Sequence, residues 1–403
     1  MDALCDACVS RISITRCFST QWSSDPFFRG AYSFLAPGSC SVDRSNLQQA
    51  VHERLWIAGE HTSVEHPATL HGAFSSGARA AADILTSLSG SPARVVVVGA
   101  GFAGLSAAKK LQDAGLHVTV LEAKEEAGGR ARSSRALGGG GEVHLGGSWM
   151  HGLDGHFLDN EPFKVEHEAW EWTLDAAVLS EDGSVASFID TSQIEEAYDI
   201  VEQAIRARAA SASESECVAD VFQECLLGSK LQGIEAHVLQ CILTADFEQS
   251  FACTLRTLSL RYCREAYHLP SPGENFPDFD SDFIIKSPLS GVLLKLKERL
   301  DVRTAVAVRS VACSSVGVVV SSDCGTYDAD VVVVTVPLGV LKAGAIDFIP
   351  ALPTKVIDRQ CHLSHFPFRL VTVSFSIRRL GYGAVYVKVR MPQPAASTSL
   401  SSS

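Results

Sequence analysis

RVVVVGAGFAGL, residues 94–105, is the stretch that decides the fold of this 403-residue chain. Its first five residues form a short apolar run rich in β-branched side chains, which predicts a buried strand of a parallel sheet. The run leads directly into Gly99, Gly101 and Gly104, the three glycines of a GxGxxG turn, and then into a helical pattern. A strand, a glycine-rich turn and a helix in this order are typical of the first half of a dinucleotide-binding βαβ unit.

A second apolar strand completes the unit at residues 117–121 and is followed by Glu122. Gly99 permits the tight turn, Gly101 lets a pyrophosphate approach the backbone, and Gly104 lets the helix pack closely on the strand. The N-terminus of the helix faces the phosphates, because its dipole favours negative charge. Glu122 lies 23 residues after Gly99, where a carboxylate can bind ribose hydroxyls. Together these features predict dinucleotide binding.

A second glycine-rich turn follows the second strand, where residues 123–132 read AKEEAGGRAR. Gly128 and Gly129 free the backbone for a close approach, and Arg130 offers a planar fork of donors for phosphate. The segment resembles the flavin-dependent oxidoreductases, in which a GG-R segment wraps the FAD pyrophosphate. This resemblance implies that FAD is the dinucleotide.

The segment LGGSWMHG, residues 145–152, resembles the flavin-containing amine oxidases, and its Trp-x-His-Gly most resembles the polyamine oxidases. The resemblance implies that Gly146 and Gly147 contact FAD and that Trp149 contacts the substrate. It also implies a catalytic role for His151. An imidazole titrates near neutrality, so it can hydrogen-bond an amine or help to deprotonate it.

The first 90 residues resemble a part of the same family that normally lies at its C-terminus. LWIAGEHTS, residues 55–63, and PATLHGAFSSG, residues 67–77, resemble the last FAD-binding motif of the amine oxidases. The resemblance implies FAD contacts by Glu60 and Thr69, and a substrate-facing ring at Tyr32 in the aromatic-rich segment before them.

Two interpretations of this order stay open. The chain is either a circular permutant, with a short flexible linker at residues 88–92, or a slice through a tandem array of modules. After Pro353 the resemblance fades, and with it the second half of the substrate domain. In the family that half supplies a lysine that holds a water against the flavin. The weak matches are Arg369 and Leu370, while Lys355 comes too early, so no counterpart is assigned.

The predicted fold class is α/β. We expect a Rossmann-like FAD-binding domain, made of a parallel sheet plus a β-meander, with a partial α+β substrate domain in a circularly permuted or truncated order. Single strands are expected at 302–311 and 331–336, and the resemblance gives Val308 a backbone contact to adenine. The expected segments are 1–90 (C-terminal-type FAD-binding segment), 91–152 (Rossmann segment), 153–281 (helical substrate segment), 282–353 (returning FAD segment) and 354–403 (divergent tail).

Composition excludes several other functions. Hydrophobic residues make up 46% and charged residues 20%, which is typical of a globular protein. The formal net charge of −12 disfavours nucleic acid and anionic membranes as partners. Cys5 and Cys8 form a lone CxxC without a second pair, so no metal site is expected. We expect a cytoplasmic protein without a membrane segment, and the oligomeric state stays open.

The function implied by the resemblance is oxidation of a C–N bond of a polyamine by FAD, with O2 as the acceptor and a small-molecule amine as the substrate. The loss of part of the substrate domain predicts impaired turnover. One alternative is a catalytically inactive fragment or FAD-binding pseudoenzyme. Another is a different amine, such as an amino acid or a methylated lysine.

Overall fold

The structure of the chain is a computed structural model, and it describes most of the residues. They are 13–135, 142–169, 177–179, 185–188, 192–209, 211–228, 239–240, 247–248, 251, 253–263, 282–353, 356, 363–365 and 371–376.

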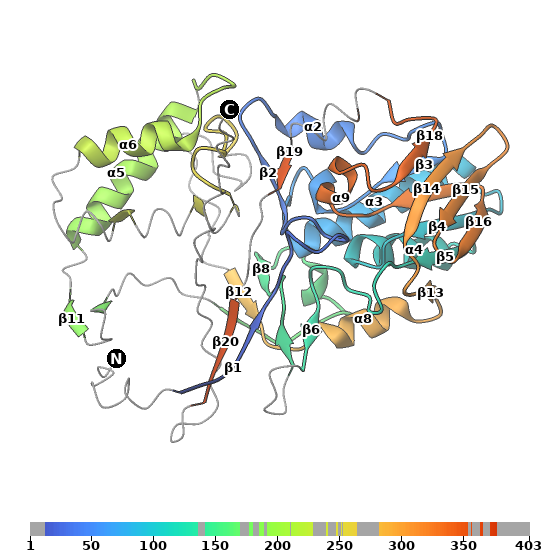
Figure 1. Ribbon diagram of the computed structural model, residues 1–403, viewed down its shortest axis with the longest axis horizontal. Coiled ribbons are helices and arrows are strands. Elements are labelled where there is room, and N and C mark those ends of the chain that lie inside the picture. Colours follow the sequence, from blue (N-terminus) through green and yellow to red (C-terminus); the bar gives the residue numbers. More distant parts are fainter. Residues whose placement is uncertain are drawn as a thin grey trace, which may run out of the picture.

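A five-stranded sheet in which every neighbouring pair is parallel forms the centre of the fold (Figure 1). The strands predicted at 94–98 and 117–121 are confirmed, and the strand expected at 331–336 ends two residues earlier. The fold is therefore mixed α/β with a Rossmann-like domain, as predicted. In spatial order the strands are β13 (Asp301–Arg303), β5 (His117–Leu121), β4 (Arg94–Val98), β17 (Val331–Val334) and β3 (Leu55–Ile57).

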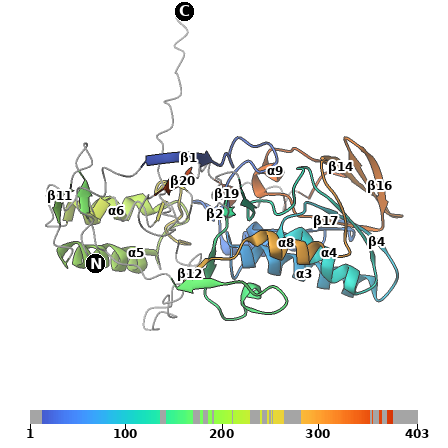
Figure 2. The ribbon, with the colours of Figure 1, turned by 90° about the horizontal axis from the view of Figure 1, so that it is seen from below.

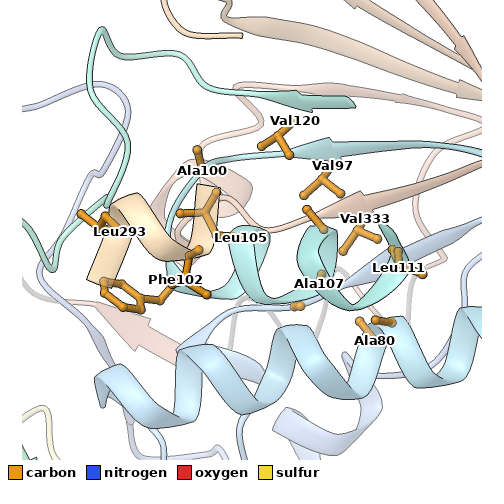
Figure 3. Close-up of a cluster of buried hydrophobic side chains, with 14 of the residues drawn as sticks. Ala80, Val97, Ala100, Phe102, Leu105, Ala107, Leu111, Val120, Leu293 and Val333 are labelled. Atoms are coloured by element: carbon orange, nitrogen blue, oxygen red, sulfur yellow. The ribbon is translucent and has the colours of Figure 1, made fainter. Parts of the chain in front are cut away.

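Three helices cover one face of this sheet: α3 (Leu70–Leu88), α4 (Phe102–Asp113) and α8 (Leu289–Lys297). Alternate strand residues such as Val97 and Val333 point into the core beneath them, together with Leu105 and Leu111 of α4 (Figure 3). All four of these side chains are fully buried or nearly so. The helices hold their positions mainly because this continuous apolar layer is removed from water.

A β-meander packs on the opposite face of the sheet. Its antiparallel strands are β16 (Gly325–Ala329), β15 (Val318–Ser322) and β14 (Val308–Cys313), in that order, and β18 (Asp347–Ile349) extends the sheet by pairing parallel to β14. The single strand predicted at 302–311 is wrong, because two strands, β13 and β14, occupy this stretch. Between them Ala305 adopts a positive φ of 54°, and the chain passes from the parallel sheet into the meander.

The N-terminal segment completes the sheet of its own chain. Strand β3 pairs with β17, and α3 packs against α4 along its length. Gly77 makes this close approach possible, because a Cβ there would overlap the carbonyl oxygen of Ala103 in α4. A short linker at 89–93 then joins α3 to β4.

A second, three-stranded sheet lies beside α3, in the order β8 (Trp149–His151), β12 (Asp282–Ile285) and β9 (His167–Ala169). Figures 1 and 2 both show helices α5 (Ser192–Ala209) and α6 (Val218–Gly228) set apart from the five-stranded sheet, and they bury their own apolar cluster. In the part of the chain that the structure describes, no helix has both the length and the apolar character to span a bilayer.

The remaining elements are short. They are α2 (Ser41–Asn46), α9 (Leu338–Lys342), the 3-10 helices η1 (Glu60–Thr62) and η2 (Phe157–Asp159), and the paired strands β1 (Ser13–Ser19) with β20 (Val371–Ser376), β2 (Ser33–Leu35) with β19 (Leu363–His365), β6 (Ser133–Ser134) with β7 (Val143–His144), and β10 (Ala177–Leu179) with β11 (Val185–Phe188).

Candidate cofactor and active site

The first glycine turn has the geometry that the sequence predicts. Gly99 has a φ of +105°, which favours glycine, and a Cβ there would lie 2.7 Å from Thr335 Oγ1. A Cβ at Gly104 would overlap the carbonyl oxygen of Gly99. These two glycines therefore let α4 start close against the end of β4.

Gly101 differs from its two neighbours, because a Cβ at this position would meet no atom within 4 Å. It is the N-cap of α4, and no side chain caps the helix there. The first turn of α4 also carries no acidic residue. Free amide donors, the positive end of the helix dipole and open space in front of them form a cradle that suits a diphosphate.

Glu122 lies beside this cradle and is 8% exposed. Its Oε2 accepts a hydrogen bond from Ala100 N at 2.7 Å, and its Oε1 accepts one from Lys124 N at 3.0 Å. Burial raises the pKa of this carboxyl, and the two amide donors oppose that effect. The segment that enters β14 also runs here, because Val306 N donates to Glu122 O at 2.8 Å and Val308 follows two residues later.

The second glycine turn is bonded directly to the first. Gly128 N donates to Ala100 O at 2.9 Å. Arg130 Nη1 donates to Ala31 O at 2.7 Å and to Glu60 Oε1 at 3.1 Å. Both acceptors of the guanidinium therefore belong to the N-terminal segment of the chain. These contacts fix the second turn next to the open space at Gly101.

Gly146 and Gly147 lie against this second turn. A Cβ at Gly146 would overlap the carbonyl oxygen of Arg130, and Gly147 N donates to the same oxygen at 3.2 Å. In the structure these glycines allow a loop to pack on the turn. Their predicted contact with FAD stays a prediction.

Glu60 and Thr69 have structural partners of their own. Glu60 is 5% exposed, and its Oε2 accepts a hydrogen bond from Ala68 N at 3.1 Å. Thr69 caps α3, because its Oγ1 accepts from Gly72 N at 3.0 Å and donates to His66 O at 2.8 Å. Both residues therefore shape the entry to α3.

The residues predicted for the substrate side lie on different elements. Tyr32 is half-buried against an apolar cluster that includes Trp22 and Phe28. Trp149 and His151 lie on β8, in the three-stranded sheet. The structure thus brings the predicted cofactor residues together at the carboxyl ends of the parallel strands. It places His151 on a neighbouring sheet.

His151 has a carboxylate partner that the sequence analysis missed. Its Nδ1 lies 2.9 Å from Asp282 Oδ1, and the two residues are directly opposite in the antiparallel pair of β8 and β12. An ionised carboxylate only accepts hydrogen bonds, so a neutral His151 carries its proton on Nδ1 and leaves Nε2 as an acceptor. The sequence gives no sign of this pairing, because the register between two strands so far apart in the chain is not visible in it.

Three further histidines place their rings in tilted contact where η2 meets the start of α3. The ring centroids of His66 and His71 are 4.2 Å apart, and those of His71 and His156 are 4.6 Å apart. His156 is 2% exposed, and burial lowers its pKa to about 4. It is therefore neutral at physiological pH. Among the residues that the structure describes, no group of three or more His, Cys, Asp or Glu has an arrangement that could hold a metal ion.

The family's lysine is not located. Lys355, Arg369 and Leu370, which were considered for it, all lie outside the described residues.

Comparison with known families identifies two matching sequence models. The model described as flavin containing amine oxidoreductase matches residues 9–85 and 268–375. The model described as NAD(P)-binding Rossmann-like domain matches residues 97–159, which contain the first glycine turn.

Curated proteins are similar to this chain in sequence, and a solved structure is similar to it in fold. The chain is 29% identical to polyamine oxidase 4 of Oryza sativa subsp. japonica over 285 residues, 66% of this chain and 55% of that protein. It is 29% identical to lysine-specific histone demethylase 1 homolog 1 of Arabidopsis thaliana, across 66% of this chain and 32% of that protein. A putrescine oxidase variant with a redesigned cofactor site shares the fold, with a TM-score of 0.50 and 22% identity over 68% of this chain and 64% of that one. The chain spans about half the length of the polyamine oxidases that it matches.

Proposed function

Because this chain belongs to the flavin-containing amine oxidases, whose cofactor is FAD, we propose that it oxidises a C–N bond of an amine. FAD, when bound, would supply the acceptor for a hydride from the carbon next to nitrogen, with O2 as the final acceptor of the two electrons and of two protons, which gives hydrogen peroxide. The observation that carries the proposal is the open cradle at Gly101, at the uncapped N-terminus of α4 and beside the buried Glu122.

The residues around the cradle have separate tasks in binding. The amides of the first turn of α4 would hold the diphosphate, and the Glu122 carboxylate has further lone pairs for ribose hydroxyls. Arg130 keeps the second turn in place through Glu60 and Ala31. Val308, Gly146 and Gly147 remain candidates for further contacts.

His151 is the group we propose to handle the substrate proton. Asp282 fixes its Nδ1 proton, so Nε2 can accept a proton from an ammonium and leave the neutral amine that loses hydride. A positioned base of this kind contributes a factor of about 10²–10⁴ to the rate. Tyr32 and Trp149 would provide aromatic walls for the alkyl chain.

The substrate class we propose is a polyamine. The support is the match to polyamine oxidases at 29% and 30% identity. A methylated lysine is the second candidate, because a histone demethylase homologue matches at the same 29%.

One experiment tests the function directly. The full chain is purified and its flavin absorbance recorded, and spermine or a methyl-lysine peptide is then added without oxygen. We expect the bound flavin to bleach with one of the two and to recover, with peroxide release, when air is admitted. A yellow protein that neither substrate bleaches would support the alternative of an FAD-binding pseudoenzyme, and a colourless protein that takes up no FAD would refute the proposal.

A further inference from the structure

Arg44, on the short helix α2, is almost completely buried, although arginine is rarely found inside proteins. Its relative exposure is 1%. Its Nη1 donates to Ser33 Oγ at 2.7 Å and to His61 O at 3.1 Å. A buried guanidinium is costly unless it acts on an opposite charge. The nearest part of the candidate site supplies that charge.

Ser33 connects Arg44 to Glu60. A serine hydroxyl has one proton, and Ser33 Oγ already accepts a hydrogen bond from Arg44, so it directs that proton to Glu60 Oε2 at 2.7 Å. The other oxygen of Glu60 holds Arg130 at 3.1 Å. A continuous chain of hydrogen bonds, buried at Arg44 and Ser33 and partly buried at Arg130, therefore runs from α2 to the second glycine turn.

We propose that Arg44 is a positioning residue that acts through Ser33 and Glu60 to hold Arg130, and with it the turn at 128–130, in the shape that receives the diphosphate of FAD. This inference rests on the proposed binding of FAD by this chain. It assigns a role to two residues, Arg44 and Ser33, that touch neither the glycine turns nor the open cradle in the contacts described above.

The charges around Glu60 fit this role. Burial on its own raises the pKa of Glu60, but Arg130, His61, Arg44 and the Ser33 hydroxyl lower it, and the net shift is downward. Burial lowers the pKa of Arg44 to about 10 and that of His61 to about 4, so at neutral pH Arg44 is charged and His61 is not. Asp43, the neighbour of Arg44, bonds the backbone of its own helix cap at Cys40 N (2.9 Å). Glu60 therefore faces two cations, and removing one of them raises its pKa.

The first test measures FAD affinity by fluorescence titration of the apoprotein. Ser33→Ala breaks the chain of hydrogen bonds, Arg44→Met removes the cation, and Arg44→Lys keeps the charge. Loss of a charge-assisted hydrogen bond predicts that FAD binds about 10- to 100-fold more weakly to Ser33→Ala and Arg44→Met, with partial recovery in Arg44→Lys. Arg54→Met is the matched control, because Arg54 bonds the carbonyls of Asp330 and Ser315 and should leave the affinity unchanged.

The second test needs no FAD and follows the acid unfolding of the apoprotein. A carboxyl whose folded pKa is depressed stabilises the fold above its unfolded pKa, and this stability is lost as the pH falls through the folded pKa. In wild type, the stabilisation that ionised Glu60 gives to the fold should therefore persist at pH values below the ordinary pKa of glutamate. In Arg44→Met and Ser33→Ala the folded pKa of Glu60 is higher, so their unfolding midpoints should move to higher pH than that of wild type.

The outcomes separate the two proposals. If wild type binds FAD and Ser33→Ala and Arg44→Met bind it as tightly, the positioning role is overturned. If wild type takes up no FAD, the proposed function fails, and the acid midpoints alone decide whether Arg44 and Ser33 act on Glu60. If Arg44→Met does not fold, Ser33→Ala, which loses a single oxygen atom, decides the outcome.

Discussion

Replacing Gly77 by alanine tests whether the N-terminal segment is an integral part of the fold. Gly77 lies in the middle of α3, where alanine ordinarily stabilises a helix by about 0.8–1.0 kcal/mol relative to glycine. The added Cβ would overlap the carbonyl oxygen of Ala103 and lie 2.8 Å from its carbonyl carbon. Because both obstacles are backbone atoms of α4, no side chain can rotate away and the two helices must separate.

The size of the effect follows from these two opposing contributions. Overpacking of a tightly packed core costs typically about 1–3 kcal/mol and occasionally more. An overlap with rigid backbone belongs at the upper end of that range. Subtracting the gain in helix propensity leaves an expected net loss of about 2 kcal/mol in the free energy of unfolding.

Gly291→Ala is the matched control, because Gly291 lies within α8 and a Cβ there would meet no atom within 4 Å. This variant should gain up to about 1 kcal/mol, so the two glycine-to-alanine changes are expected to have opposite signs. Urea unfolding followed by circular dichroism measures the change in the free energy of unfolding for both variants, provided that the slope of free energy against urea concentration (the m-value) is the same as in wild type. If Gly77→Ala is as stable as Gly291→Ala, α3 does not pack on α4 in this chain, and the N-terminal segment belongs to another module.

Three further predictions concern the site. Gly101→Ala should lower the free energy of unfolding by no more than about 1 kcal/mol, because its Cβ meets no atom within 4 Å and only the preference of the N-cap for glycine is lost. It should nevertheless weaken FAD binding at least tenfold in a titration, since the same space is the proposed diphosphate cradle; undiminished binding would place the diphosphate elsewhere. Acid precipitation of the loaded protein should release the flavin into the supernatant, because no cysteine lies between His66 and Thr69 to form a thioether, and a yellow pellet would show a covalent link. In a protein that oxidises amines, His151→Ala should slow anaerobic flavin reduction by about 10²–10⁴-fold. Asp282→Asn should also slow it, because the Nδ1 proton of His151 loses its carboxylate acceptor. An unchanged rate in His151→Ala would leave this residue without a catalytic role.

The parts of the fold that follow from local patterns were predictable. The strands at 94–98 and 117–121 have the bounds that their apolar runs indicate, and the glycine turn between them has the backbone geometry that its motif requires. Each of these patterns extends over no more than about a dozen residues. Each also reflects burial in a single sheet, so no distant part of the chain is needed to interpret it. The break between β13 and β14 was missed, because valines recur on both sides of it and the sequence pattern shows no interruption. The chain turns there because β14 belongs to the second sheet.

The parts that depend on long-range pairing were not predictable. Asp282 reaches His151 only because two strands 131 positions apart pair in one register. Arg44 reads in the sequence as an ordinary surface charge, and its burial follows from the packing of α2 against η1. Networks of polar side chains need the whole fold, because a change of one residue in register would separate their members.

The position of β17 within the sheet has a consequence for biosynthesis. Its four valines pair with β4 on one side, and three of them, residues 332–334, pair with β3 on the other, although both of those strands are translated long before it. During synthesis, β3 and β4 therefore lack the strand that lies between them in the sheet until the segment after β5 has been made. At about 5–20 residues per second, this takes on the order of tens of seconds. During that interval two apolar strand edges are unpaired, and such edges are templates for aggregation. Until β17 arrives, these two edges therefore expose the nascent chain to aggregation.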